Sequence, residues 1–304
     1  MKDGILAIDK PEGISSAGVV ARVKRVLGVK KIGHTGTLDP FATGVLLIAL
    51  QKATRISRFF LAGTKHYTAR VTLGIETDTQ DCTGRIVSEA APEVVGAISP
   101  EDVLRTVALF AGSQEQIPPS FSALKHKGQP LYKLARQGEM IQKPPRSIQI
   151  YTISVPDMRL PEFTLDVHCS GGTYIRSLAN DIGKKLGCGA HLSGLRRTQS
   201  GAFGLGNALG LSALEKMTPE EIAPYILPMS DCLFFLPSVT ADTRCEKKIS
   251  FGQRLSFEEI VPHLPPGSAL PDCIRMVDAS NQLLALIEPD KDQAFYNYCC
   301  VFSC

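Results

Sequence analysis

A loop rich in glycine, threonine and acid-base side chains is the densest cluster of reactive residue types in the sequence. It runs from Gly33 to Gly44 and holds three glycines, three threonines, His34 and Asp39. Glycine lets a backbone approach a ligand closely, and loops on rigid elements often carry catalytic groups. A carboxylate held there could act as a nucleophile or a general base. Asp39-Pro40 is equally typical of a plain turn, and the loop alone does not distinguish the two interpretations.

Several other chemistries lack their motifs. The sequence has no P-loop, no dinucleotide-binding glycine pattern, no G-x-S-x-G nucleophile elbow and no H-E-x-x-H zinc motif. Its six histidines show no metal-ligand spacing, and its nine cysteines are scattered and form no C-x-x-C pair. We therefore expect no metal, no cofactor and no disulfide framework. The C-terminal Cys299, Cys300 and Cys304 are interpreted as incidental thiols of a terminal strand.

Local patterns predict the elements that hold the loop. Gly4–Ile8 is typical of a short strand, Ser15 or its neighbour can cap a helix, and Gly28 stands where that helix would end. Lys65–Leu73 alternates apolar and polar side chains with period two, which predicts a strand with Tyr67 on its apolar face. These elements would place the loop between two apolar segments.

The order of the later elements indicates the fold class. Strands near residues 147–155 and 163–169 precede a Gly171-Gly172 turn and a helix that begins close to Arg176. The strands and helices do not follow a regular βαβ rhythm. We therefore predict an α+β fold with a mixed or antiparallel central sheet flanked by helices.

Composition and charge suggest two domains. The chain has 304 residues, of which 44% are hydrophobic and 21% charged, as in ordinary globular proteins. Proline-rich breaks between 214 and 237 predict a larger domain over residues 1–230 and a small β-rich domain over residues 231–304. Lys and Arg outnumber Asp and Glu by 27 to 20 up to residue 227 and fall to 6 against 10 after it. A polyanionic partner should therefore contact the larger domain.

Location follows from what the sequence lacks. The longest purely apolar run, Val45–Leu50, is too short to cross a bilayer, and the first residues have no apolar signal-peptide core. We therefore expect a cytoplasmic protein without a membrane contact.

One segment is strongly basic. Residues 121–147 contain a single acid, Glu139, and two aromatic residues, Phe121 and Tyr132. Its basic residues are Lys125, Lys127, Lys133, Arg136, Lys143 and Arg146. The segment could be a solvated surface excursion or an arm that contacts phosphates, and composition alone favours neither.

Longer motifs resemble one known family. DKPEGISS and GHTGTLDPFATGVL are followed, in order, by KHY, LGIETDTQDCTG, IPPSFSALKHKGQPLYKLARQG and HCSGGTYIRSLANDIGKKLGCGAHLSGLRR. Together these segments resemble the TruB family of tRNA pseudouridine synthases over most of residues 4–200. The resemblance implies a pseudouridine-synthase-type catalytic domain and, by position and length, a PUA-like C-terminal domain.

The resemblance also implies roles for individual residues. Asp39 matches the essential catalytic aspartate, Arg176 the active-site arginine and Tyr67 the active-site tyrosine of the family. An ionised aspartate in a dry pocket needs a cationic partner, which Arg176 would supply. The carboxylate could attack C1′ of the ribose or C6 of the base, or take a proton in a glycal route, and the sequence does not choose. Substrate contacts are implied for His34, Leu195, Lys10, Lys65 and Tyr174.

The implied substrate is uridine 55 in the T-loop of tRNA, which must be flipped out of the folded loop to react. The basic insertion, at about residues 117–147, would clamp the T-arm. Its implied RNA contacts are Lys125, Lys127, Lys133 and Arg136. We expect a monomer without an obligatory protein partner.

Three alternatives remain. The scaffold could be a non-catalytic RNA-binding or tRNA-folding module, but such a module is expected to lack Asp39 or Arg176. It could belong to the guide-RNA-dependent branch of the same superfamily, which normally carries N-terminal extensions and a fuller RNA-binding domain. A glycosidase that pairs Asp39 with Asp78 or Asp81 is the third.

Overall fold

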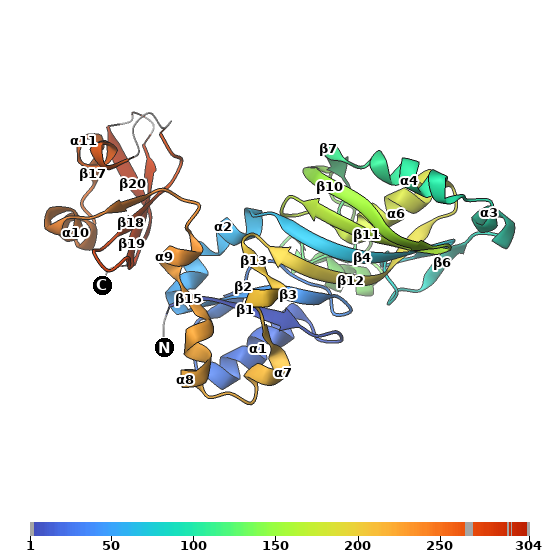
Figure 1. The fold of residues 1–304 in the computed structure, drawn as a ribbon, viewed down its shortest axis with the longest axis horizontal. Coiled ribbons are helices and arrows are strands. Elements are labelled where there is room, and N and C mark those ends of the chain that lie inside the picture. Colours follow the sequence, from blue (N-terminus) through green and yellow to red (C-terminus); the bar gives the residue numbers. More distant parts are fainter. Residues whose placement is uncertain (1–2, 265–269, 291, 293, 303–304) are drawn as a thin grey trace.

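The computed structural model describes residues 3–264, 270–290, 292 and 294–302. Within them, eleven strands form one large sheet (Figure 1). Its main path runs β14 (Leu209–Gly210), β1 (Gly4–Lys10), β3 (Thr43–Leu50), β12 (Ala190–Ser200), β4 (Lys65–Leu73), β11 (Glu162–Cys169), β10 (Arg146–Arg159) and β7 (Gly112–Gln116). β2 (Ile32–His34), β13 (Phe203–Gly204) and β15 (Ile226–Pro228) pair with it off this path.

The large sheet is mixed. β3 and β12 are parallel, whereas β12–β4, β4–β11 and β11–β10 are antiparallel. With helices on the sheet and a second, smaller sheet after it, the α+β class and the mixed or antiparallel central sheet are confirmed.

Alternation along the strands assigns the two faces of the sheet. The first face packs against the long helices α1 (Ser16–Leu27), α4 (Pro100–Ala108) and α6 (Ile175–Leu186), and against the short α7 (Leu211–Leu214) and α8 (Pro219–Ile222). Tyr67, Ala69 and Val71 of β4 belong to this core, as the period-two pattern predicts. On the opposite face, β1 and β3 pack against η1 (Gln51–Ile56), α2 (Ser57–Ala62), α9 (Met229–Cys232) and part of the C-terminal domain.

Helix α1 confirms the predicted caps. The Ser15 side chain accepts a hydrogen bond from the Gly18 amide, and Gly28 ends the helix in the left-handed conformation. Strand β12, in contrast, is not predicted by any pattern in its sequence, although it lies in the middle of the sheet between β3 and β4.

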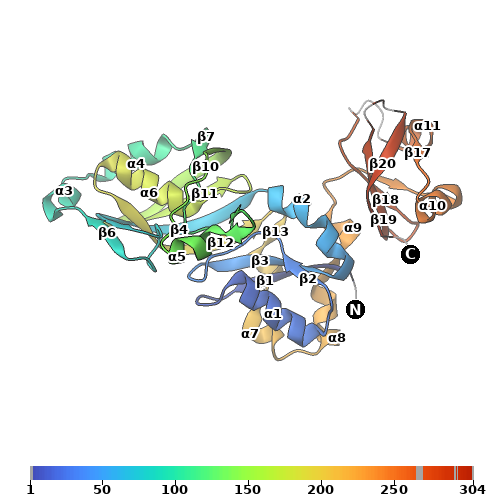
Figure 2. The same cartoon turned by 180° about the vertical axis from the view of Figure 1, so that it is seen from behind.

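The short elements fill the connections. They are β5 (Ile75–Thr77), β6 (Ile86–Glu89), α3 (Pro92–Gly96), η2 (Leu205–Asn207), α7 (Leu211–Leu214), α8 (Pro219–Ile222) and η3 (Ala223–Tyr225). Helices α7 and α8 lie beside α1 at the β1 end of the sheet (Figures 1 and 2).

The C-terminal part has its own sheet. Its strands run in the order β16 (Ser238–Thr240), β18 (Ile274–Val277), β19 (Leu283–Pro289), β20 (Phe295–Val301) and β17 (Leu255–Ser256), with α10 (Thr243–Ser250), α11 (Phe257–Ile260) and η4 (Val261–His263) beside them. This confirms a small β-rich domain, consistent with a PUA-like one. The chain leaves the large sheet at β15 and enters the small one at β16; the exact boundary near residue 230 stays a prediction.

The terminal cysteines fall partly in this domain. Cys299 and Cys300 lie on β20, as expected for a terminal strand, and Cys304 lies outside the described residues.

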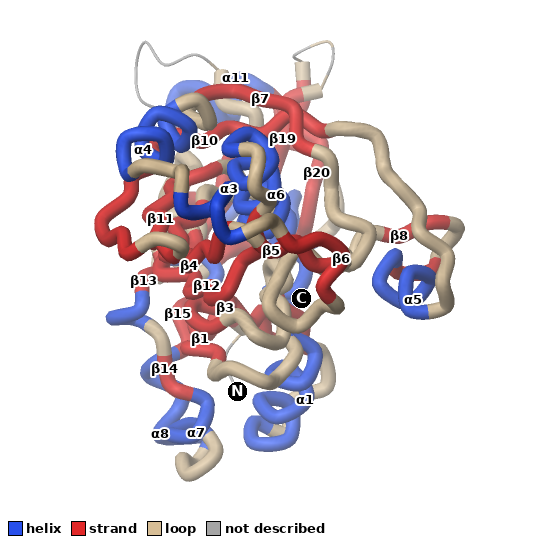
Figure 3. Tube along the Cα trace, turned by 90° about the vertical axis from the view of Figure 1, so that its right-hand side faces the viewer, coloured by secondary structure: helices blue, strands red, loops and turns tan. Residues whose placement is uncertain are grey.

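The basic insertion stands apart from the sheet. β8 (Lys125–His126), β9 (Gln129–Pro130) and α5 (Leu131–Arg136) form a small unit that projects to one side on long connections (Figure 3). Among the described residues, no helix is long and apolar enough to cross a membrane.

Candidate active site

The loop between β2 and β3 is fixed by contacts with α1 and β1. Ser16 Oγ donates to the Leu38 carbonyl (2.9 Å) and accepts from the Leu38 amide (2.8 Å). The fully buried Lys10 Nζ donates to the carbonyls of Pro11, Ile14 and Pro40 at 2.7–3.1 Å. These bonds hold the backbone on both sides of Asp39 in one conformation.

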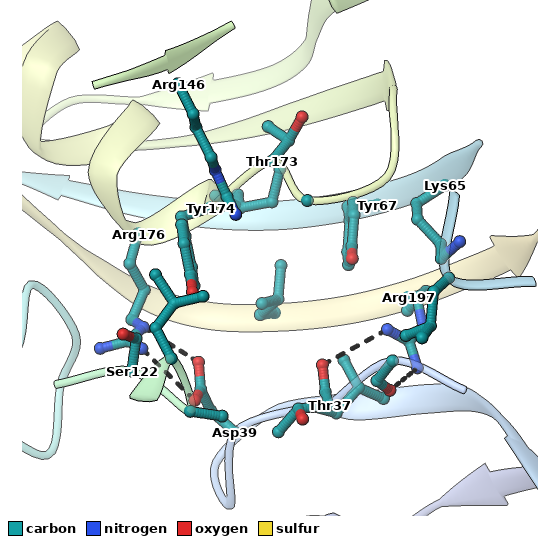
Figure 4. Close-up of a pocket in the computed structure, with 18 residues that line it drawn as sticks. Thr37, Asp39, Lys65, Tyr67, Ser122, Arg146, Thr173, Tyr174, Arg176 and Arg197 are labelled. Atoms are coloured by element: carbon teal, nitrogen blue, oxygen red, sulfur yellow. Dashed lines mark hydrogen bonds and ion pairs between the residues drawn. The ribbon is translucent and has the colours of Figure 1, made fainter. Parts of the chain in front are cut away.

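Asp39 forms an ion pair with Arg176 at the start of α6 (Figure 4). Arg176 Nε lies 2.9 Å from Asp39 Oδ2 and Nη2 lies 3.4 Å from Oδ1. The guanidinium also donates to the Thr79 and Phe121 carbonyls, each at 2.7 Å. The Arg176 side chain is 4% exposed and that of Asp39 33%, so the cation is fixed while the carboxylate still faces open space.

A second carboxylate supports the same arginine. Asp81 Oδ2 lies 3.4 Å from Arg176 Nη1, and Asp81 accepts further hydrogen bonds from Thr79 and Thr83. Asp78 instead pairs with the exposed Arg85. Neither acid is a free partner for Asp39, which removes the basis for paired glycosidase carboxylates.

Two cavities meet at the Asp39–Arg176 pair. The first, of about 360 Å³, is lined by Tyr67, Leu195, Lys65, Tyr174 and Arg146 together with the pair itself. The second, of about 720 Å³, carries the pair, His34, and Tyr132 and Arg136 of the insertion. The first has the size of a small-ligand pocket, and the second opens toward the basic insertion.

Burial perturbs the ionisable groups around the two cavities. It raises the pKa of the Asp39 carboxyl; the positive charge of Arg176 opposes this rise and the negative charge of Asp81 adds to it. Burial also raises the pKa of the Tyr67 hydroxyl and lowers that of Lys65 to about 8. Burial and the charge of Arg197 lower the pKa of His34. The site therefore holds an acid that needs its arginine to stay ionised, next to a protonated phenol.

Arg197 on β12 holds the first part of the loop. Its side chain is almost fully buried and donates to the carbonyls of Val45 (2.7 Å) and Gly36 (3.1 Å). At Gly44 the backbone φ is +101°, and a Cβ atom would lie 2.2 Å from the Arg197 carbonyl oxygen. Glycine is required there because β3 and β12 approach so closely.

Comparison with known proteins identifies the family. A model of the TruB family pseudouridylate synthase N-terminal domain matches residues 24–175, and a model of the tRNA pseudouridylate synthase B C-terminal domain matches residues 176–233. The tRNA pseudouridine synthase B of Dehalococcoides mccartyi is 38% identical over 97% of this chain and 95% of its own length. The chain belongs to the TruB family. The corresponding protein of Syntrophotalea carbinolica is 46% identical over 82% of this chain and 81% of its own length.

Solved structures agree on the TruB-type fold. A crystal structure of a Cbf5-Nop10-Gar1 complex contains a chain that matches 99% of this one, with 28% identity and a TM-score of 0.75; 85% of that chain is covered. An H/ACA ribonucleoprotein bound to a substrate RNA gives 26% identity and a TM-score of 0.73, with 99% and 85% of the two chains covered. As a TruB-family protein, this chain is a pseudouridine synthase, an isomerase.

The residues implied by the TruB resemblance fall into three groups. Asp39, Tyr67, Arg176, Leu195, Lys65 and Tyr174 line the first cavity, and His34 lines the second. Lys125, Lys127, Lys133 and Arg136 are exposed on the insertion, where Arg136 also lines the second cavity. Lys10 lines neither cavity: all its contacts anchor the loop from below, so its place is a supporting one.

The sequence did not predict the place of two residues in this TruB-type site, and it assigned a third residue to the wrong surface. Arg197 has only its place in the LRR stretch as a signal, and the pattern there singles out Leu195. Asp81 is considered only as a glycosidase acid. Arg146 is counted among the basic residues of the insertion, but its side chain lies in the wall of the first cavity rather than on the surface arm.

Proposed function

We propose that this pseudouridine synthase converts uridine 55 in the T-loop of tRNA to pseudouridine, with Asp39 as the catalytic carboxylate. The relatives that match most of the chain are named tRNA pseudouridine synthase B, which supports tRNA as the substrate. The observation that carries the proposal is the Asp39–Arg176 pair at the mouth of a cavity that also holds Tyr67 and Leu195.

The reaction is an isomerisation and its atoms balance without another reactant. The bond between N1 of uracil and C1′ of the ribose breaks, and a bond between C5 and C1′ forms. C5 loses its hydrogen as a proton, and N1 takes one up. Asp39 can attack C1′ or C6, or accept a proton in a glycal route, and each route needs the ionised carboxylate that Arg176 stabilises.

The cavity suits a base that has left the stack. Tyr67 offers a flat ring and a protonated hydroxyl, and Leu195 offers an apolar wall. The two residues lie on the paired strands β4 and β12. A flipped uracil held between such groups places its reacting atoms near the bound carboxylate. The Tyr67 hydroxyl is then available to assist proton transfer at C5.

The insertion supplies the RNA contact. Lys125, Lys127, Lys133 and Arg136 are exposed on a unit that borders the second cavity, through Tyr132 and Arg136. Arg136 also lies over the Tyr132 ring, with 5.8 Å between Cζ and the ring centroid. In this proposal these residues clamp the T-arm by its phosphates, and the protein works as a cytoplasmic monomer.

The test is release of tritium from tRNA transcript labelled at C5 of uridine. Wild-type protein should release close to one equivalent, Asp39→Asn none, and a transcript with cytidine at position 55 should give no release with either. A folded wild-type protein that binds tRNA but releases no tritium would contradict the proposal.

The assay also addresses the guide-dependent alternative, which the similarity to Cbf5 chains brings forward. It contains one protein and one RNA, so turnover excludes a need for guide RNA or protein partners. Release that appears only after a guide RNA and accessory proteins are added would favour the guide-dependent branch instead.

A further inference from the structure

Arg146 is a cation without an acceptor in the wall of the first cavity. It is the first residue of β10, at the point where the basic insertion rejoins the sheet. Its Nε and Nη2 atoms are buried and have no hydrogen-bond partner among the described residues. Arg146 takes part in none of the ion pairs that the described residues form; the arginines of the site and of the neighbouring strand pair with other carboxylates.

The position of the Arg146 guanidinium is fixed from both sides. Cζ lies 4.4 Å from the centroid of the Tyr174 ring, a cation–π distance. The Tyr174 backbone is in turn held by the buried Gln116 side chain, through bonds of 2.8 and 2.9 Å. At Gly172 a Cβ atom would lie 3.4 Å from Arg146 Cζ and Nη1, so glycine leaves the guanidinium the space it occupies.

The other cations of the cavity are already engaged. Lys65 Nζ donates to the Phe60 and Gly63 carbonyls, Arg176 to Asp39 and two carbonyls, and Arg197 to three carbonyls. Among the described lining residues, Arg146 is the one cation without an acceptor. Arg146 is half-buried, but its buried Nε and Nη2 groups without a partner are unfavourable, so a ligand that supplies an anionic acceptor to them would relieve the cost.

The arrangement of the free N–H groups selects the ligand. Nε and Nη2 carry neighbouring, parallel N–H bonds, the fork that matches two oxygens of one anion. A phosphodiester offers two non-bridging oxygens, whereas each carbonyl of uracil offers one. The flipped nucleotide brings such a phosphate to the cavity on either side of its ribose.

We propose that Arg146 binds the phosphodiester group that adjoins the flipped uridine, with Tyr174 holding the guanidinium in place. This inference rests on the proposed function, since it takes RNA as the ligand. It separates Arg146 from the exposed residues of the insertion: these attract the T-arm, whereas Arg146 fixes the reacting nucleotide from inside the cavity. Loss of Arg146 should therefore weaken binding and also misplace the ribose relative to Asp39.

The test is a double-mutant cycle between protein and RNA. Binding of a T-arm stem-loop is measured in an Asp39→Asn background, where no turnover is expected, with and without Arg146→Met. The RNA carries a neutral methylphosphonate in place of the phosphate on the 5′ or the 3′ side of the target uridine. Arg146→Lys keeps the charge without the fork, and Arg105→Met is a matched control on the exposed side of α4.

We expect Arg146→Met to weaken binding about ten- to a hundredfold, the effect of losing a charge-assisted hydrogen bond. One of the two methylphosphonates should weaken binding to the Asp39→Asn protein by the same factor. The same methylphosphonate should not weaken binding to the Asp39→Asn protein that also carries Arg146→Met any further. The slope of log affinity against log salt should fall by about 0.8. The affinity of Arg146→Lys for the RNA should lie between those of the Asp39→Asn protein and Arg146→Met. Arg105→Met should bind the RNA as tightly as the Asp39→Asn protein does.

Two outcomes would overturn the assignment. If both methylphosphonates add their full cost to that of Arg146→Met, the arginine contacts the base or acts through the structure. If Arg146→Met binds like the parent, it contacts nothing in the RNA. Both differ from failure of the proposed function, in which wild-type protein releases no tritium from tRNA; melting temperatures report whether each variant is folded.

Discussion

Replacing Arg176 by methionine tests the electrostatics of the site most directly. The substitution keeps an unbranched apolar stem and removes the guanidinium that contacts both Asp39 and Asp81. Burial then acts on Asp39 with only the weaker opposing charge of Lys10 left, so the pKa of its carboxyl rises further above its already raised value. A smaller fraction of the enzyme carries the ionised carboxylate at neutral pH.

The size of the effect follows from the burial of the pair. Removing one partner of a buried ion pair destabilises the charge that is left behind by about 3–5 kcal/mol. Here that charge is the ionised carboxylate of Asp39, which the proposed reaction uses. Asp39 exposes 33% of its side chain, and water screens that part, so the lower limit applies. A loss of about 3 kcal/mol in the transition state corresponds to about a hundredfold lower rate.

Single-turnover tritium release measured across pH is the assay. In the wild type, activity should fall as pH drops through the raised pKa of Asp39, and in Arg176→Met this acid limb should move to higher pH. Activity of the variant should therefore recover partly as pH rises. Arg176→Lys should keep the limb close to that of the wild type but stay slower, because lysine cannot reach the Thr79 and Phe121 carbonyls together. A folded Arg176→Met variant with a rate within tenfold of the wild type and an unmoved acid limb would refute this reasoning.

Three further outcomes are expected. Lys133→Gln combined with Arg136→Gln should weaken tRNA binding and lower the salt slope by about 1.5, with little change in the rate at saturation; an unchanged slope would argue against phosphate contacts. Burial lowers the pKa of Lys65 from 10.5 to about 8, so the unfolded chain binds this proton more tightly and wild-type stability gains up to about 3 kcal/mol as pH rises through that window. Urea unfolding of wild type and Lys65→Met at about pH 7.5 and pH 10 should show a larger gain in the wild type, because Lys10, whose pKa is also lowered to about 8, contributes equally to both proteins; a difference between the two proteins that is equal at both pH values would contradict it. Gly44→Ala should lose about 3 kcal/mol or more in the same experiment, because its Cβ would meet the Arg197 backbone, and an unchanged urea midpoint would be the contrary result.

Elements whose patterns are local could be predicted from the sequence. The caps of α1 and the alternation of β4 are visible in the order of residue types, because each depends on neighbours within a few positions. Strand β12 is different. It is polar for a central strand, and what holds it there is pairing with β3 and β4, which begin about 150 and 125 residues earlier in the chain.

The site shows the same division. Asp39 could be noticed from its loop, but its partner Arg176 lies 137 positions away, and only the resemblance to TruB proteins joins the two before the structure does. Arg197 escapes because arginine is rarely buried, so its type indicates a surface residue. No local pattern encodes that a strand arginine ends among the carbonyls of a loop.

That choice of acceptors explains how a basic site keeps a usable acid. Lys10 and Arg197 hold the loop through carbonyl oxygens, not through carboxylates. Satisfied in this way, neither cation forms an ion pair with Asp39, and among the described residues the carboxylate pairs with Arg176, while Lys10 acts on it only at longer range. Asp81 contacts Nη1 of the Arg176 guanidinium, whereas Asp39 contacts Nε. Asp81 therefore holds Arg176 in place and leaves the Nε edge to Asp39. The carboxylate is thus held by one cation and remains open toward the cavity, which is the arrangement that an acid attacking or deprotonating a nucleotide requires.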